Sequence, residues 1–249
     1  MRYVFQKNAG LPAARNTGIR AARHPLVCFL DADDVLLPGL LRQAAETLNR
    51  LPEAFALVAF HFQFMDGEGN PLPVKTLPPG QGEEISGHDI ILKTRFGTTG
   101  LVAKREVFGE CGYFDETLRS SEDRDMWIRI ASRRRIFLHG ESLVQLRRHT
   151  ISMSRNSARM KENIRRMLDK AYQDRRVPRG NVFFWLSAYS FLNFQSAWMY
   201  FDEGRRGRAI RDLLHSLLLW PWFPHPDRLN EPPLFRLRGL LRFLLNKRG

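Results

Sequence analysis

The chain has 249 residues, of which 43% are hydrophobic and 11% aromatic, enough apolar surface for one large core or two smaller ones, which excludes a disordered protein. No window of the sequence reaches the roughly 18 apolar residues that a membrane-spanning helix needs. The two cysteines, Cys28 and Cys111, lack metal-ligand spacing, so we expect reduced thiols in a cytosolic protein.

Positive charge is concentrated in the second half of the chain. The net charge is +13, but residues 1–146 hold 18 Lys/Arg and 18 Asp/Glu, whereas residues 147–249 hold 21 and 8. A neutral first half joined to a basic second half indicates two regions with different tasks.

Helix and strand patterns alternate over the first 150 residues. We expect, in order, the tail of a strand at 3–5, a helix at 11–22, a buried strand of a parallel sheet at 26–30, a helix at 39–51 and a strand at 55–65. After an irregular loop at 71–86 follow a strand and a short helix within 99–116, a helix at 122–134, and strands near 135–139 and 143–147. This alternation predicts an α/β sheet with crossover connections.

Only helical patterns follow residue 155. They predict helices at about 155–175, 181–203, 205–220 and 233–246, separated by proline-containing breaks. We therefore place a domain boundary between residues 1–154 and a basic helical region at 155–249.

Three carboxylates, Asp31, Asp33 and Asp34, follow the predicted strand at 26–30. Ligands of open α/β sheets bind beyond the carboxyl ends of the strands, and clustered carboxylates repel one another unless a cation or hydrogen-bond donors neutralise them. Oxygen ligands of this kind suit Mg²⁺ or Mn²⁺, which also takes phosphate oxygens of a substrate. The pattern predicts a metal site for a phosphate-containing substrate. The alternative is that Asp33 or Asp34 caps the helix that begins near Pro38.

A second acidic cluster, Ser121 with Glu122, Asp123 and Asp125, lies at the start of the helix at 122–134. Helix capping and the helix dipole favour such residues, so a structural role alone would explain them. His149 follows a predicted strand, where it is either a metal or diphosphate contact or a structural histidine.

The segment NAGLPAARNTGIRAA…LVCFLDADDVLLPGLL resembles the nucleotide-sugar domain of family 2 glycosyltransferases, in which an N-x-G-x-x-x-A-R-N helix precedes a strand and a D-x-D motif. GECGYFDE, SEDRDMWIRI and RRHTISMS are similar to later landmarks of that family, in the same order. The resemblance covers residues 1 to about 155. It implies a Rossmann-like α/β domain of the GT-A type, followed here by a helical region.

The resemblance implies roles for the matching residues. Asp33 would be the direct metal ligand, Asp31 would lie near the ribose or behind the metal, and Asp123 would be the general base. Transfer from a nucleoside diphosphate needs a base for the incoming hydroxyl and a cation for the departing diphosphate, and a single displacement inverts the anomeric centre. Among the other matching residues, Glu122 and Arg147 would line the acceptor or diphosphate region, His149 would approach the metal, and Asn8, Gly10, Arg15 and Asn16 would shape the donor nucleotide pocket.

The start of the chain departs from the family pattern. The family opens with a strand and a D-D-G-S type turn that holds the nucleobase and ribose, whereas this sequence begins at what would be the third strand. We expect an N-terminally incomplete domain that lacks on the order of 30 to 60 residues, and strands at 3–5 and 26–30 without partners.

The end of the chain is basic and amphipathic. Leu237, Leu240, Leu241, Leu244 and Leu245 share one helical face, and Arg238, Arg242 and Lys247 lie mostly off it. Together with the Trp-containing tract at 213–223, this pattern is typical of helices on membrane surfaces. The alternative is that the leucines form the core of the helical region. A nucleic-acid partner is not expected, because no binding motif accompanies the charge.

We therefore expect an inverting, Mg²⁺- or Mn²⁺-dependent glycosyltransferase that uses a nucleotide-sugar donor and a glycan or lipid-linked acceptor. We expect it in the cytoplasm or peripheral at the cytoplasmic face of an anionic membrane. Two alternatives stay open, a catalytically deficient remnant that binds a glycan or partner, and a basic nucleic-acid-binding protein.

Overall fold

The structure is a computed structural model that describes residues 2–72, 82–92, 95–148, 156–174, 176, 182–221 and 234–245. The chain forms two compact units, Met1–Ser152 and Met153–Gly249. Within the described parts, no helix combines the length and apolar character needed to cross a bilayer.

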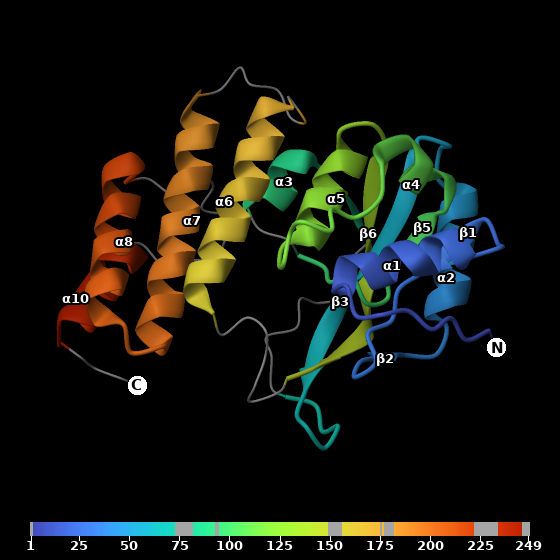
Figure 1. The fold of residues 1–249 in the computed structure, drawn as a ribbon, viewed down its shortest axis with the longest axis horizontal. Coiled ribbons are helices and arrows are strands. Elements are labelled where there is room, and N and C mark those ends of the chain that lie inside the picture. Colours follow the sequence, from blue (N-terminus) through green and yellow to red (C-terminus); the bar gives the residue numbers. More distant parts are fainter. Residues whose placement is uncertain are drawn as a thin grey trace. The chain divides into compact units, whose positions relative to one another are not determined.

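A six-stranded mixed sheet organises the first unit (Figure 1). Its strands are β1 (Leu26–Cys28), β2 (Val35–Leu36), β3 (Phe55–Met65), β4 (Glu83–Ile85), β5 (Val102–Lys104) and β6 (Arg135–Arg147). The spatial order is β1-β5-β3-β6-β2, and β4 pairs with β6 beside this path. Among the described strands, β3 and β6 are parallel and the other pairs are antiparallel.

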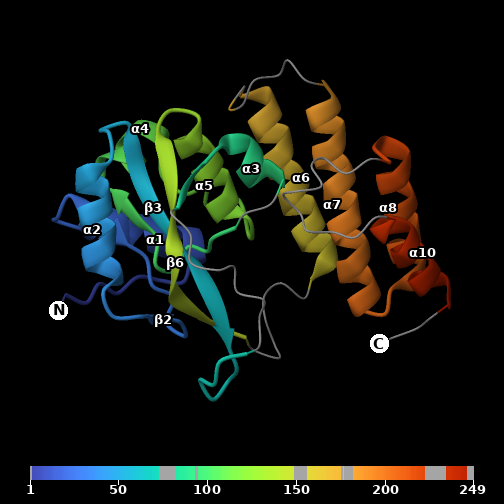
Figure 2. The ribbon, with the colours of Figure 1, turned by 180° about the vertical axis from the view of Figure 1, so that it is seen from behind.

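Helices cover both faces of this sheet. They are α1 (Leu11–Ala21), α2 (Leu40–Arg50), α3 (Gly87–Leu92), α4 (Glu106–Cys111) and α5 (Glu122–Ala131). Leu40, Ala44 and Leu48 of α2 pack on Val58 and Phe60 of β3. Figures 1 and 2, seen from opposite sides, show α2 on one face and α1 with α5 on the other. On that other face, the rings of Phe29 and Trp127 each meet Phe114 edge to face, at centroid distances of 5.6 and 5.7 Å.

Several predicted elements are confirmed. The expected helices at 11–22 and 39–51 correspond to α1 and α2, with Pro12 in the first turn of α1, and the strand at 55–65 is β3. The two strands expected near 135–139 and 143–147 are one strand, β6. The break between them is a register irregularity, because Phe60 pairs with His139 but His61 pairs with Ser142.

Two expectations about the first strands are wrong. Residues 3–5 form no strand, and Tyr3 and Phe5 are 83% and 80% exposed, because no described strand pairs with this segment. The strand expected at 26–30 is shorter, and its hydrogen-bonded neighbour β5 is antiparallel, with Leu26 opposite Lys104. Its partner comes from later in the chain, so it is not left without one.

The second unit contains α6 (Ser157–Gln173), α7 (Val182–Asp202), α8 (Arg206–Leu219) and α10 (Phe235–Leu245), which confirms the predicted helices. Its core joins Phe194 and Phe201 of α7 to Leu213 of α8 and Phe243 of α10. The fully buried Asp212 of α8 accepts a hydrogen bond of 2.6 Å from Lys161 of α6. This ion pair ties two helices of the same unit together.

Candidate active site

The acidic loop at 31–34 follows β1, as the sequence predicted. Phe29, just before this loop, is anchored because the Gly100 amide donates a backbone hydrogen bond of 2.9 Å to its carbonyl. A turn then closes from the Asp34 amide to the Asp31 carbonyl at 3.1 Å. The loop therefore lies against the segment that leads into β5.

The carboxylate of Asp34 is held by two donors from distant segments. The Thr99 hydroxyl donates at 2.5 Å and the Arg147 amide at 3.0 Å, while the Asp31 amide donates to Thr99 Oγ1 at 3.3 Å. Burial raises the pKa of Asp34 above its ordinary value, and these hydrogen bonds oppose the rise. The helix-cap alternative is wrong, since the residue before α2 is Gly39, and no side chain caps that helix.

Arg15 joins the two acidic clusters. Its buried guanidinium donates from Nη1 to Glu122 Oε1 at 2.9 Å and from Nη2 to Asp31 Oδ1 at 3.3 Å. Burial raises the pKa of Glu122, as does the neighbouring Asp123 carboxylate, against the opposing effect of Arg15. The clusters that the sequence separates thus meet around one cation of the protein itself.

Asp123 lies in the first turn of α5, half-buried. The Thr98 hydroxyl donates to its Oδ2 at 3.5 Å, and the Arg124 amide donates to its Oδ1 at 2.7 Å. The residue before the helix, Ser121, has a φ of 61° and makes no side-chain cap, so the expected capping by Ser121 does not occur. Left-handed backbone in a residue other than glycine is costly and clusters at functional sites.

Sequence reasoning missed Thr98 and Thr99. These adjacent residues are buried, and one hydroxyl serves the cluster at 122–123 while the other serves the loop at 31–34. The available signal was the Thr-Thr-Gly run immediately before a predicted strand.

A buried side chain in the middle of α1 holds the loop that follows α4. Asn16, which is 1% exposed, donates to the Phe114 carbonyl at 2.9 Å and accepts from the Phe114 amide at 2.8 Å. Its Nδ2 also donates to Glu116 at 2.8 Å. The Asn16 side chain therefore holds the protein's own backbone.

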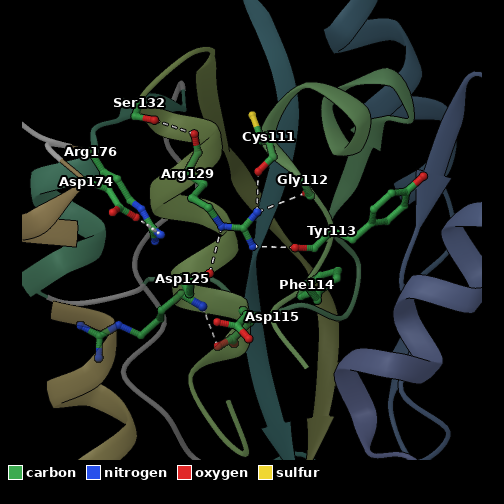
Figure 3. A network of polar contacts seen from close by, with 12 residues as sticks. Cys111, Gly112, Tyr113, Phe114, Asp115, Asp125, Arg129, Ser132, Asp174 and Arg176 are labelled. Carbon is green, nitrogen blue, oxygen red and sulfur yellow. Dashed lines mark hydrogen bonds and ion pairs between the residues drawn. The ribbon is translucent and has the colours of Figure 1, made fainter. Parts of the chain in front are cut away.

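Arg129 fixes α5 to the same loop (Figure 3). Its guanidinium donates to the carbonyls of Cys111 and Tyr113 at 2.6 and 2.8 Å, and to the buried Asp125 carboxylate at 2.9 Å. Two side chains from different helices, Asn16 and Arg129, thus hold the loop at 111–114. This gives the first turn of α5 a defined position.

The remaining predicted site residues have these places. Arg147 donates from its guanidinium to the carbonyls of Asp33 at 3.0 Å and Gly67 at 2.8 Å, so it organises the acidic loop and the turn after β3. Asn8 Oδ1 accepts from the Gly10 amide at 3.0 Å, just before α1. His149 lies outside the described residues.

The chemistry of the acidic loop fits a divalent cation that takes oxygen ligands. Asp33 is exposed and Asp31 and Asp34 are half-buried; Asp31 pairs with Arg15, and Asp34 accepts a hydrogen bond from Thr99. Over the residues that the structure describes, no three Asp, Glu, His or Cys side chains converge as a metal cage. Mg²⁺ and similar ions are often held by one or two carboxylates together with substrate phosphates, and Asp33 fits that role.

Comparison with known proteins shows a similarity to one family within the first unit. The model of glycosyl transferase family 2 matches residues 1–114. An uncharacterized glycosyltransferase of Rickettsia conorii is 25% identical over 154 residues, covering 60% of this chain and 25% of the relative. The chain thus spans about a quarter of that relative's length.

Two solved structures share the fold. S. aureus TarS 1–349 in complex with UDP aligns with a TM-score of 0.51 and 15% identity, over 98% of this chain and 74% of that one. The mannosyltransferase PcManGT from Pyrobaculum calidifontis, in complex with GDP-Man and Mn²⁺, aligns with a TM-score of 0.53 and 15% identity, over 97% and 68%.

Proposed function

Since the model of glycosyl transferase family 2 matches residues 1–114 and the chain has the GT-A fold, we propose that it belongs to this family and transfers a sugar from a nucleoside-diphosphate sugar to a hydroxyl group, with inversion. The observation that carries this proposal is the meeting of the two acidic clusters around Arg15. One carboxylate, Asp33, is exposed in the loop after β1, and another, Asp123, lies half-buried at the start of α5.

The donor is proposed from chemistry and from the neighbours' ligands. TarS was solved with UDP and PcManGT with GDP-Man and Mn²⁺, so both of these proteins bind a nucleoside diphosphate or its sugar ester, and PcManGT also binds a divalent cation. We assign Asp33 and His149 as contacts of the cation, which when bound stabilises the negative charge of the departing diphosphate. For Asp31, which pairs with Arg15, we propose a place near the donor's ribose or behind the cation.

Asp123 is proposed as the general base. It accepts the proton of the acceptor hydroxyl as that oxygen bonds to the anomeric carbon and the bond to the diphosphate breaks. Thr98 holds one of its carboxylate oxygens and the Arg124 amide the other. Attack opposite to the leaving group inverts the anomeric centre, which requires no second carboxylic acid, unlike glycoside hydrolysis.

Substitution of the proposed base tests this function. Asp123→Asn keeps the size and hydrogen bonding of the side chain but cannot accept a proton, so we expect transfer to fall by roughly 10² to 10⁴ while donor affinity stays unchanged. Release of UDP or GDP from a panel of nucleotide sugars with Mn²⁺ measures turnover, and calorimetry measures donor affinity. Donor binding without any release by the unmodified chain would favour the binding-remnant alternative instead.

We further propose that the acceptor is a glycan or a lipid-linked glycan and that the protein works at the cytoplasmic face of a membrane. The support is the charge of the helical unit, where residues 153–249 hold 19 Lys/Arg against 8 Asp/Glu. Anionic lipids attract such segments. Fractionation of cells that express the full chain would test this location. We expect the protein in the membrane fraction and expect salt to release it.

A further inference from the structure

A stripe of leucines lies on the side of α10 that the core of the helical unit does not cover. Leu237, Leu241, Leu244 and Leu245, here the leucine stripe, are 46%, 58%, 48% and 63% exposed. The sequence-based alternative, in which these leucines form the core of the helical region, is wrong for these four. Of the predicted set, only Leu240 packs against that core.

The other side of α10 is firmly seated in its own unit. The ring of Phe243 stacks on Phe201 at a centroid distance of 4.4 Å, and a Cβ on Gly239 would lie 3.6 Å from Leu213 Cδ2. The buried Arg236 donates from Nη1 to Ser190 Oγ and to the Trp220 carbonyl, each at 2.7 Å. These contacts fix the rotation of the helix, so the leucine stripe faces outward.

Exposed arginines lie beside the leucine stripe and at its end. Arg238 and Arg242 are exposed on α10 itself. The guanidinium of Arg206 donates to the Leu244 carbonyl, which brings the start of α8 to the end of the stripe (Figures 1 and 2 show α8 beside α10). Arg208 in that turn of α8 is also exposed, and Arg205, just before the helix, is exposed and pairs with Glu203 at 3.3 Å.

We propose that the leucine stripe is a docking surface for an anionic lipid bilayer. An exposed apolar stripe flanked by arginines is the arrangement in which a helix lies in the membrane interface, with its leucines among the acyl chains and its cations at the headgroups. A polynucleotide would use the arginines but not the leucines. A second copy would bring the same arginines together, which repel. The inference rests on the proposed peripheral location and names its surface and its lipid.

Flotation with vesicles tests this surface. We expect the chain to float with vesicles of phosphatidylcholine and phosphatidylglycerol, to float less as salt rises, and to stay unbound with phosphatidylcholine alone. Leu241→Glu should weaken binding by roughly tenfold or more, because a leucine that lies among the acyl chains in the bound state is replaced by a carboxylate that the anionic headgroups repel. The matched control is Leu41→Glu, because Leu41 of α2 is 57% exposed but lies in the other unit.

A charge pair completes the design. Arg238→Glu should weaken binding, whereas Arg42→Glu, the same charge change on α2, should not. Leu237→Glu provides a second test of the stripe should Leu241→Glu alter the helical circular-dichroism signal. Three outcomes would overturn the proposal. Leu241→Glu and Leu41→Glu could lose vesicle binding equally, or the chain could be retained more strongly on DNA than on anionic vesicles at matched salt. In the third, Leu241→Glu would break up a dimer while flotation stays unchanged. The assay needs no sugar transfer, so its failure leaves the proposed transfer standing.

Discussion

Single hydroxyl and carboxylate groups decide what the acidic loop can do. Among its three carboxylates, Asp31 is neutralised by Arg15 and Asp34 is held by Thr99 and the Arg147 amide. Asp33 is the exposed carboxylate of the loop. Without these donors the carboxylates of the loop would repel one another. The donors give neighbouring aspartates different surroundings, so residues of the same type can have different roles.

Asp33→Ala tests the proposed cation contact. We expect turnover of the nucleotide sugar to be lost and the dependence on Mn²⁺ to weaken, while thermal stability changes little, because an exposed side chain contributes little to the core. Activity assays across a Mn²⁺ titration and a melting curve provide the measurements. Asp202→Ala, another exposed aspartate, is the control. Full activity of Asp33→Ala, or full activity of the unmodified chain in excess EDTA, contradicts the assignment.

At the scale of elements, buried polar contacts hold α1, the acidic loop and α5 together. Arg15 and Asn16, neighbours on α1, reach Glu122 of α5 and the loop at 111–114. Arg129 of α5 reaches that loop from the other helix. The proposed base and the proposed cation contact therefore belong to elements that polar side chains hold together.

The ion pair between Arg15 and Glu122 should behave as a coupled pair. Arg15→Met leaves a buried carboxylate unpaired and should lower the free energy of unfolding by about 3–5 kcal/mol. In the double variant Arg15→Met/Glu122→Gln the loss should be smaller than the sum of the two single losses, as urea titrations would show. Arg20→Met, at an exposed position of the same helix, should cost less than about 1 kcal/mol. Additive losses would contradict the coupling.

Gly100 sets how closely the segment that carries Thr98 and Thr99 approaches β6. Its φ is +78°, and a Cβ there would lie 2.3 Å from Val144 Cγ2. Gly100→Ala should therefore lower the free energy of unfolding by about 2–5 kcal/mol, from left-handed backbone and overpacking together. Gly109→Ala is the control, because nothing lies within 4 Å of its Cβ position in α4. At this helical position an alanine should stabilise the fold slightly relative to glycine. Equal stabilities of the two variants would argue against this role.

For the molecule as a whole, two kinds of carboxylate give the stability of the fold opposite dependences on pH. In the first unit, burial raises the pKa of the half-buried Asp34 and of the buried Glu122, whereas the ion pair with Arg134 lowers the pKa of the exposed Glu110. These shifts change the pH dependence of folding in opposite directions.

Stability measured against pH distinguishes the two kinds of group. A raised pKa means that the folded chain binds the proton more tightly than the unfolded chain. The stability difference between the unmodified chain and Glu122→Gln should therefore be greatest below about pH 4 and decrease as pH rises through the raised pKa. For Glu110→Gln the difference should instead decrease as pH falls below about 4. Urea titrations at several pH values test both, and a rise with pH in the first series would contradict the burial effect on Glu122.

The sequence by itself determined the features that depend on local pattern. The helices at 11–22 and 39–51, the strand at 55–65 and the four later helices follow from side-chain periodicity, which is a property of neighbouring residues. The family resemblance also lies in contiguous motifs. An acidic loop after a strand was therefore predictable, as was a leucine face flanked by arginines.

Only the tertiary structure decided which segments meet. The antiparallel pairing of β1 with β5, the hydrogen bond from Thr99 to Asp34 and the ion pair from Arg15 to Glu122 all join residues far apart in the sequence. It also decided that Phe243 and Gly239, not the leucine stripe, face the core of the helical unit. Burial and hydrogen bonding depend on the surfaces that come together in space, and no local pattern specifies those surfaces.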